Sequence, residues 1–213
     1  MYINSHYPFE NIKLNYSFSD LVPEFSYETL FAHYNNYYLK YLKNLNDILT
    51  EYPALQKFSL DELLFNNNLL PENVSKDIVF YAGGVYNHQV YFESMGKKKE
   101  EILDGLLKDK LINTFGSIQN FLMEFKKAAV SFRGSGYVYL VCNEHNELSL
   151  FSVVNQDTTV PFNLCPLMCI DLWEHAYIHD FGTNKDKYVE TFINLINWEM
   201  IDSKYNECLK YIN

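Results

Sequence analysis

An aspartate and a histidine stand four residues apart in the stretch Asp171-Leu172-Trp173-Glu174-His175. If the aspartate ends a strand and the histidine lies one helical turn later, their side chains can converge on one point. A carboxylate and an imidazole arranged in this way are typical of a metal site. The same spacing also suits an acidic helix start whose histidine is hydrogen-bonded by a neighbour. The spacing alone leaves both interpretations open.

Other histidines could complete such a site, and the chain contains His6, His33, His88, His145, His175 and His179. A histidine taken alone is more often a surface or core residue than a ligand. His33 and His88 stand out because each lies among aromatic residues on a helix face that we expect to be buried. With Asp171 and His175 they offer three nitrogens and one oxygen, a set that suits manganese, iron or zinc better than calcium or magnesium. A buried polar cluster without metal also remains open.

Two long helices must position the first two of these histidines. Residues 27–52 carry apolar and aromatic side chains at spacings of three and four, which predicts one long amphipathic helix containing His33. Residues 71–95 predict a second long helix containing His88. Gly83-Gly84 in its middle would destabilise an exposed helix, so these glycines indicate close packing or room for a group from elsewhere. Together the two helices predict an antiparallel hairpin.

The second half of the chain has a mixed pattern. Residues 98–131 predict two helices, and residues 136–155 predict a β-hairpin around a polar turn. Residues 165–171 predict a third strand that leads directly into the Asp171 motif, and a closing helix is expected around 188–200. This pattern predicts an α+β architecture.

Composition excludes some classes of function. The formal net charge is -10, whereas a nucleic-acid-binding surface needs clustered lysines and arginines. The basic run at 97–99 is followed at once by two glutamates, and we interpret it as a solvated helix start. The first residues lack the basic start and apolar run of a secretory signal, and no stretch is apolar enough to span a membrane. We therefore expect a cytoplasmic protein without nucleic-acid or membrane partners.

The four cysteines, Cys142, Cys165, Cys169 and Cys208, form no CxxC pair. In a reducing compartment such scattered cysteines are more often buried thiols than disulfides. We expect four thiols.

Several stretches, in the same order, resemble the iron/manganese superoxide dismutase family along nearly the whole chain. The strongest is DLWEHAYIHD (171–180), which is similar to the family signature DxWEHAYY. The others are HYNNYYLKYLKNLN (33–46), YNHQVYF (86–92), GSGYVYLV (134–141) and NLINWE (194–199). Ordered matches across one chain are far more specific than any single motif.

The resemblance implies both a fold and an activity. The fold would be α+β, with an N-terminal antiparallel helical hairpin (residues 1–96) followed by an α/β domain with a three-stranded antiparallel sheet (residues 97–213). Superoxide would be converted to oxygen and hydrogen peroxide by an antioxidant oxidoreductase. The resemblance implies that one Mn ion per chain, or alternatively one Fe ion, is bound by His33, His88, Asp171 and His175.

The resemblance also implies roles for residues around the metal. Tyr41 matches the family's gateway tyrosine. Gln156 matches the glutamine that bonds metal-bound solvent in manganese-type members, whereas iron-type members commonly carry a glutamine at the position of Gly84. Because Gly84 would leave room for Gln156, the pattern favours manganese.

Glu174 and Tyr177 keep family positions at a subunit interface. The resemblance implies a homodimer, or a tetramer, in which Glu174 reaches the ligand His175 of the other subunit and fixes its tautomer. Glu174 could instead be an acid that only complements a helix dipole. Tyr177 would contact Tyr37 across the interface.

Departures from the family surround the ligands and do not replace them. Tyr37 stands where a proton-relaying histidine is usual, Asn36 where a lysine attracts superoxide, and Tyr137 and Phe92 where tryptophans are usual. On an acidic chain the loss of a cation weakens the local field that attracts an anion. We therefore expect a lower or more salt-sensitive rate than in a well-optimised member.

Two alternatives remain. One is a degenerate, non-catalytic, metal-binding relative with a storage or interaction role, which the altered residues favour. The other is a non-haem iron oxygenase with two histidines and one carboxylate. The third matched histidine disfavours the oxygenase because it fills a coordination position that such chemistry uses.

Overall fold

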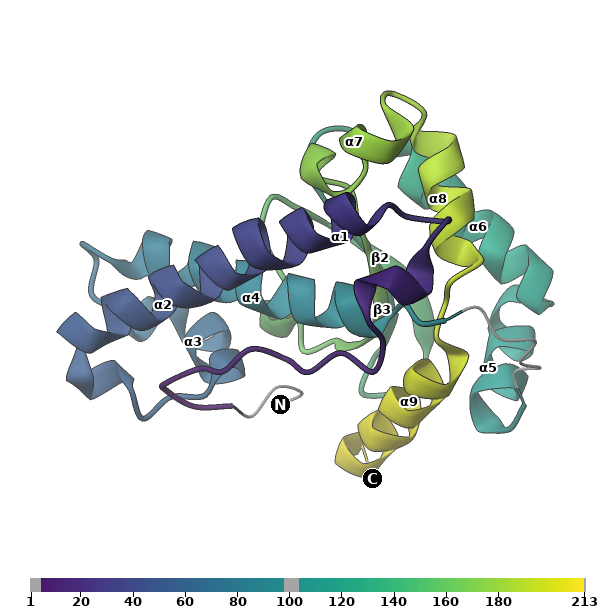
Figure 1. Ribbon diagram of the computed structural model, residues 1–213. Coiled ribbons are helices and arrows are strands. Elements are labelled where there is room, and N and C mark those ends of the chain that lie inside the picture. Colours follow the sequence, from purple (N-terminus) through teal and green to yellow (C-terminus); the bar gives the residue numbers. More distant parts are fainter. Residues whose placement is uncertain (1–4, 98–103, 213) are drawn as a thin grey trace.

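The computed structural model describes residues 5–97 and 104–212 of the chain, and it shows an α+β fold (Figure 1). Its α-helices are α1 (Tyr27–Ala32), α2 (Leu39–Glu51), α3 (Leu60–Phe65), α4 (Ser75–Glu93), α5 (Leu106–Phe115), α6 (Ile118–Ser131), α7 (Ile178–Phe181), α8 (Lys185–Ile193) and α9 (Trp198–Ile212). Its strands are β1 (Gly136–Cys142), β2 (Leu148–Val154) and β3 (Cys165–Asp171). The helix start expected just after the basic run at 97–99 lies outside the described residues.

A helical hairpin forms the N-terminal half. Helices α1 and α2 are joined by a π-helical segment, η2 (His33–Tyr38), into one long rod that lies beside α4 (Figure 1). Within η2 the amide of Leu39 bonds to the carbonyl of Tyr34, five residues earlier. The predicted antiparallel hairpin is confirmed, but the regular helix expected over 27–52 contains this π-helical segment. Such segments insert one extra residue into a helix and are frequent at functional sites.

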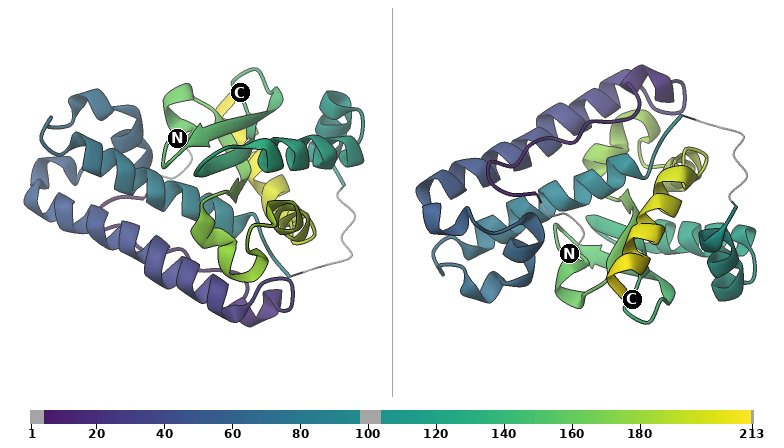
Figure 2. Two further views of the ribbon diagram at one scale, coloured as in Figure 1. Left: turned by 90° about the horizontal axis from the view of Figure 1, so that it is seen from above. Right: turned by 90° about the horizontal axis from the view of Figure 1, so that it is seen from below.

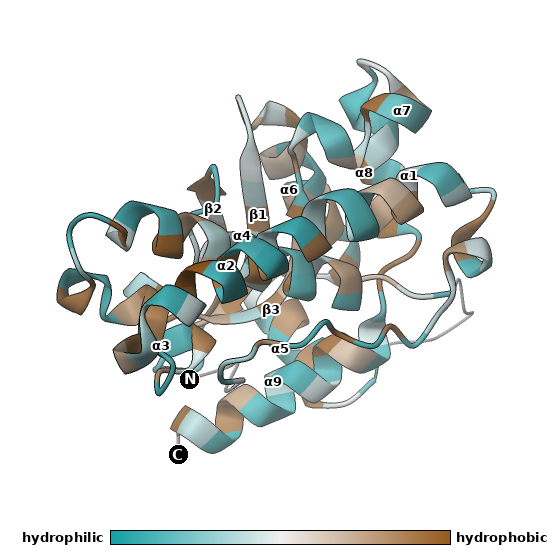
Figure 3. Ribbon diagram, turned by 60° about the vertical axis from the view of Figure 1, so that its left-hand side comes forward, coloured by the Kyte–Doolittle hydropathy of each residue, from teal (hydrophilic) through white to brown (hydrophobic). Residues whose placement is uncertain are grey.

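Helix α4 lies in the centre of the molecule. Every residue from Ala82 to Phe92 is buried, as expected for a helix packed on all sides. It packs against α2, α3 and β3. By contrast, hydrophilic and hydrophobic residues alternate from turn to turn along α2 and α9 (Figure 3), as expected for helices with one solvated face.

The sheet among the described residues has the strand order β2-β1-β3, with both pairs antiparallel. Central β1 is entirely buried. Helices α4 and α9 pack against β3, whereas α5 and α6 pack against β2 and β1 (Figure 2). The register places Tyr137 of β1 opposite Asp171 of β3. The predicted three-stranded sheet is confirmed, and its third strand delivers Asp171 to the end next to α4.

The prediction of a single closing helix around 188–200 is wrong, because α8 ends at Ile193 and α9 begins at Trp198. The intervening backbone bonds to the end of α4: Gly96 donates to the carbonyl of Leu195 at 2.9 Å, and Asn197 donates to that of Ser94 at 2.9 Å. The side chain of Asn197 then accepts a hydrogen bond from the amide of Met200 at 3.1 Å. These tertiary bonds interrupt a segment whose local pattern is helical.

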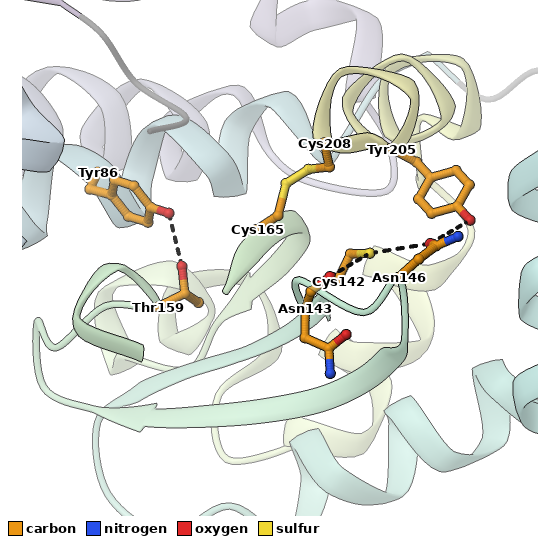
Figure 4. Close-up of a disulfide and its surroundings, with 8 residues drawn as sticks. All are labelled: Tyr86, Cys142, Asn143, Asn146, Thr159, Cys165, Tyr205 and Cys208. Atoms are coloured by element: carbon orange, nitrogen blue, oxygen red, sulfur yellow. Dashed lines mark hydrogen bonds between the residues drawn. A yellow bond between two sulfur atoms is a disulfide. The ribbon is translucent and has the colours of Figure 1, made fainter. Parts of the chain in front are cut away.

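A disulfide joins Cys165 at the start of β3 to Cys208 in α9 (Figure 4). The expectation of four thiols is therefore wrong for these two cysteines, while Cys142 and Cys169 are buried thiols. The disulfide partners lie 43 residues apart in sequence, and the packing of α9 on β3 brings their Cα atoms to 6.2 Å. Sequence spacing carries no information about this proximity.

Among the described residues, no helix combines the length and the apolar character needed to cross a membrane.

Candidate metal centre

Four elements from the two halves of the chain meet at one buried point. His33 begins η2, His88 lies in α4, Asp171 ends β3, and His175 lies in a single 3-10 turn (Glu174–Ala176). The side chains of His33, His88 and Asp171 are fully buried, and that of His175 is 7% exposed. The centre therefore exists only when the hairpin is packed against the sheet.

The ligand-type atoms of these residues face one another. Oδ2 of Asp171 lies 3.3 Å from Nε2 of His33, 3.5 Å from Nε2 of His175 and 3.9 Å from Nε2 of His88. One ligand atom from each of the four residues lies within 4.8 Å of the other three. Atoms arranged in this way can all coordinate one ion placed between them.

These atoms also lack hydrogen-bond partners in the described part of the chain. Nε2 of each of the three imidazoles and Oδ2 of Asp171 are buried and unpartnered. A buried polar atom without a partner destabilises a protein by about 1–3 kcal/mol, so four that face one another require an explanation. A cation supplies one, because each atom can donate a lone pair to it. The mixed nitrogen and oxygen set suits Mn or Fe.

The remaining atoms of the candidate ligands hold them in orientation. Nδ1 of His88 lies 2.7 Å from the carbonyl of Gly84, which places the proton on Nδ1 and leaves the Nε2 lone pair free. Oδ1 of Asp171 accepts a hydrogen bond from the amide of Trp173 at 2.8 Å, leaving Oδ2 for the centre. Tyr188 donates to the Asp171 backbone carbonyl at 2.6 Å.

The protonation states of the candidate ligands at neutral pH favour metal binding. Burial, together with the neighbouring imidazoles and against the opposing effect of Asp171, lowers the pKa of His33 to about 4 and that of His88 to about 3. Burial alone would raise the pKa of Asp171, but the imidazoles of His175 and His33 outweigh it and hold this pKa well below its usual range. Neutral imidazoles and an ionised carboxylate are the forms that bind metals.

Aromatic rings pack around the imidazoles. Tyr37 stacks on His175 with 4.1 Å between ring centroids and 16° between planes. The ring of Phe92 lies 5.1 Å from that of His33. Two of the residues that depart from the family pattern, Tyr37 and Phe92, therefore contact ligand residues directly.

A hydrogen-bond network lies beside the centre. Nε2 of Gln156 donates to the hydroxyl of Tyr41 at 3.2 Å. Oε1 of the same amide accepts from Nδ2 of Asn87 and from the hydroxyl of Tyr137, both at 3.1 Å. Tyr139 in turn donates to Oδ1 of Asn87. Because its amide is bonded at both ends, Gln156 is fixed next to Tyr41, whose ring lies 5.2 Å from that of His88.

Sequence reasoning missed Asn87 as a member of this network. A signal was available, because Asn87 directly precedes His88 in a helix whose other nearby residues are mostly apolar or aromatic. A buried amide there requires hydrogen-bond partners.

The two glycines of α4 admit different groups from those expected. A Cβ at Gly84 would lie 2.4 Å from Cδ1 of Tyr41, and a Cβ at Gly83 would lie 2.0 Å from the backbone oxygen of Gln156. The prediction that Gly84 leaves room for Gln156 therefore needs correction. Gly84 makes room for the ring of Tyr41, and Gly83 makes room for the Gln156 backbone.

Glu174 and Tyr177 lie outside the four-residue cluster. Glu174 is exposed, and Tyr177 is half-buried and stacks on Tyr188 at 5.1 Å between ring centroids. His6, His145 and His179 also lie outside the cluster, and all three are exposed.

Comparisons with known proteins agree with this architecture. Residues 8–96 match the family model of the iron/manganese superoxide dismutase α-hairpin domain, and residues 103–204 match that of the C-terminal domain. Superoxide dismutase [Mn] 1 of Leptolyngbya boryana is 32% identical over 90% of this chain and 78% of its own. Superoxide dismutase [Mn] of Listeria monocytogenes is 31% identical over 93% of this chain and 98% of its own.

Proposed function

The chain belongs to the iron/manganese superoxide dismutase family, and we infer that it converts superoxide to oxygen and hydrogen peroxide at the buried centre of three histidines and one aspartate. It is an oxidoreductase whose substrate is superoxide and whose cofactor is one Mn or Fe ion per chain. When bound, the metal supplies one-electron oxidation and reduction of superoxide in alternate half-reactions. The observation that carries this proposal is the set of four buried, mutually facing and unpartnered ligand atoms.

Manganese is the metal that we propose. The relatives described above are named as manganese enzymes. The amide next to Tyr41 comes from Gln156 in the C-terminal half and not from the second-ligand helix, where position 84 is a glycine. Metal analysis of protein purified from cells supplied with both metals would test this choice, and an excess of iron in active protein would contradict it.

The neighbouring residues would hold and deliver protons, two of which are needed to form hydrogen peroxide. Burial raises the pKa of Tyr41 despite the hydrogen bond from Gln156, so its hydroxyl keeps its proton at neutral pH. We assign Tyr41 and Gln156 to proton delivery and Tyr37 to the outer end of the same path. The supporting contacts are the Gln156–Tyr41 bond and the stacking of Tyr37 on His175.

A homodimer is the proposed assembly, with a tetramer as the larger possibility. Exposed Glu174 is free to reach His175 of a second copy, and in the described residues no hydrogen bond engages Nδ1 of His175. A Glu174→Ala variant should lose dimer and metal together, as measured by sedimentation and elemental analysis. A variant that stays dimeric with full metal content would contradict this role.

Domain division and location stay predictions. A boundary between residues 96 and 97 is supported by the two family-model matches, which end at 96 and begin at 103. A cytoplasmic location is harder to reconcile with the Cys165–Cys208 disulfide, because disulfides are rare in the reducing cytosol. Cell fractionation with thiol trapping would test both the location and the redox state.

Elemental analysis and stopped-flow decay of superoxide test the proposed function. Wild-type protein should contain about one metal ion per chain and remove superoxide, as the four-ligand centre implies. Asp171→Ala should lose both properties, whereas His145→Ala, which removes an exposed histidine far from the motif, should lose neither. Stoichiometric metal without activity would instead support the non-catalytic relative.

A further inference from the structure

A cavity of about 300 Å³ lies where η2 and α2 meet the first half of α4. Its lining includes Tyr37 of η2 and Tyr41 of α2, and also Phe80 and Tyr81 of α4. Two of these side chains also contact candidate metal ligands, since Tyr37 stacks on His175 and Tyr41 lies 5.2 Å from His88. The cavity therefore lies next to aromatic residues that contact the candidate metal ligands.

Lys40 is the charged residue of this cavity. The other lining residues are neutral tyrosines, asparagines and a phenylalanine, and no carboxylate from the part of the chain that the structure describes lines it. Lys40 is exposed, and no ion pair joins it to another residue in the described ranges. Its positive charge is therefore not neutralised by any neighbour within residues 5–97 and 104–212.

Lys43, one turn further along α2, provides a contrast. It forms an ion pair with Asp47, its side chain is 72% exposed, and it does not line the cavity. The two lysines share a helix and a charge but differ in what they face, so they form a matched pair for an experiment.

We propose that Lys40 is the cation that draws superoxide into the cavity above Tyr37 and Tyr41. This inference rests on the proposed function, because superoxide carries one negative charge and the chain carries a formal charge of -10. An unpaired cation that lines the cavity raises the local concentration of a small anion there, against the repulsion of the whole molecule. It also compensates in part for the absence of a cation at position 36, where the neutral Asn36 lines the same cavity one helical turn earlier.

Stopped-flow superoxide decay at several ionic strengths tests the proposal on the metal-loaded protein. Lys40→Gln should lower the second-order rate constant about two- to fivefold at low salt, as expected for one charge near an incoming anion. The difference from wild type should shrink as salt screens the charge. Lys40→Glu should lower the rate further, Lys40→Arg should restore it, and Lys43→Gln should leave it unchanged.

A second readout does not depend on turnover. Azide, a small anion with the same charge as superoxide, should bind the loaded Lys40→Gln protein with a Kd raised by a similar factor, as measured by optical titration. Equal effects of Lys40→Gln and Lys43→Gln, or no effect of Lys40→Gln at low salt, would overturn the role of Lys40. A wild-type protein that binds azide but does not remove superoxide would overturn the proposed function, while the azide comparison would still decide the role of Lys40 in attracting anions.

Discussion

Gly84 is the residue on which the placement of Tyr41 depends. In Gly84→Ala the new Cβ would lie 2.4 Å from Cδ1 of Tyr41, too close for any real contact, so the ring must move. Because this ring carries the hydroxyl bonded to Gln156, we expect the free energy of unfolding of the metal-free protein to fall by about 1–3 kcal/mol and superoxide removal to slow. Urea unfolding and stopped-flow decay measure the two effects.

Gly96→Ala is the control for this substitution. Its Cβ would meet Nδ2 of Asn197 at 3.2 Å, a contact that a shift of a few tenths of an ångström relieves without breaking the bond from Met200 to Oδ1. We expect a smaller loss of stability and no change in superoxide removal. A Gly84→Ala protein as stable and active as wild type would show that the position of Tyr41 does not depend on this glycine.

Single residues were predictable from sequence where their motif was local. Asp171 and His175 lie four residues apart in one short stretch, and the structure places both in the same cluster. The partners of Gln156 were not predictable, because Asn87 lies in α4 and Tyr137 in β1, and their hydrogen bonds depend on how the helical hairpin packs against the sheet.

The junction between α8 and α9 depends on Asn197. Its side chain caps α9 by accepting a hydrogen bond from the amide of Met200, and its backbone N–H donates to the carbonyl of Ser94 at the end of α4. Asn197→Ala should lower the free energy of unfolding by about 1–2 kcal/mol, the usual effect of losing such a cap. Asn197→Asp keeps an accepting oxygen and should retain most of the stability. Urea unfolding of the metal-free proteins measures both, and equal losses in the two variants would contradict the capping role.

Elements were predictable where periodicity and tertiary packing agree. The strand expected at 165–171 has the same bounds in the structure, where all of its residues are buried. The π-helical segment at His33–Tyr38 and the break at 194–197 were missed. In both places the side-chain pattern is helical, and only backbone hydrogen bonding distinguishes the outcome.

Buried tyrosines make the whole molecule sensitive to alkali. Burial raises the pKa of Tyr38 to about 12 and raises the pKa values of other interior tyrosines: Tyr16, Tyr91, Tyr137, Tyr139 and Tyr188. In the unfolded chain these hydroxyls have the ordinary tyrosine pKa of about 10. Stability is therefore fully present below that pH and is lost as the pH rises toward the folded values, because the unfolded chain then releases more protons.

Ultraviolet titration of tyrosinate measures this effect. The exposed tyrosines should ionise first and reversibly, and the six interior ones should ionise only together with the loss of circular dichroism. A smooth titration of all 18 tyrosines in a protein that stays folded would contradict the burial of these hydroxyls.

The Cys165–Cys208 disulfide links the sheet that carries Asp171 to the last helix, so its loss should affect the stability of the whole molecule. Closing a loop of 43 residues restricts the unfolded chain, which corresponds to about 4 kcal/mol in the chain-entropy model. Cys208→Ser should lower the free energy of unfolding by up to this amount. Reductant should lower the free energy of unfolding of the wild type to the same value without affecting the variant.

Thiol titration of denatured, unreduced protein should find two thiols, those of Cys142 and Cys169. Four thiols would show that the pair is reduced under the conditions of purification, and the stability difference between wild type and variant should then vanish, because no covalent link restricts the unfolded chain.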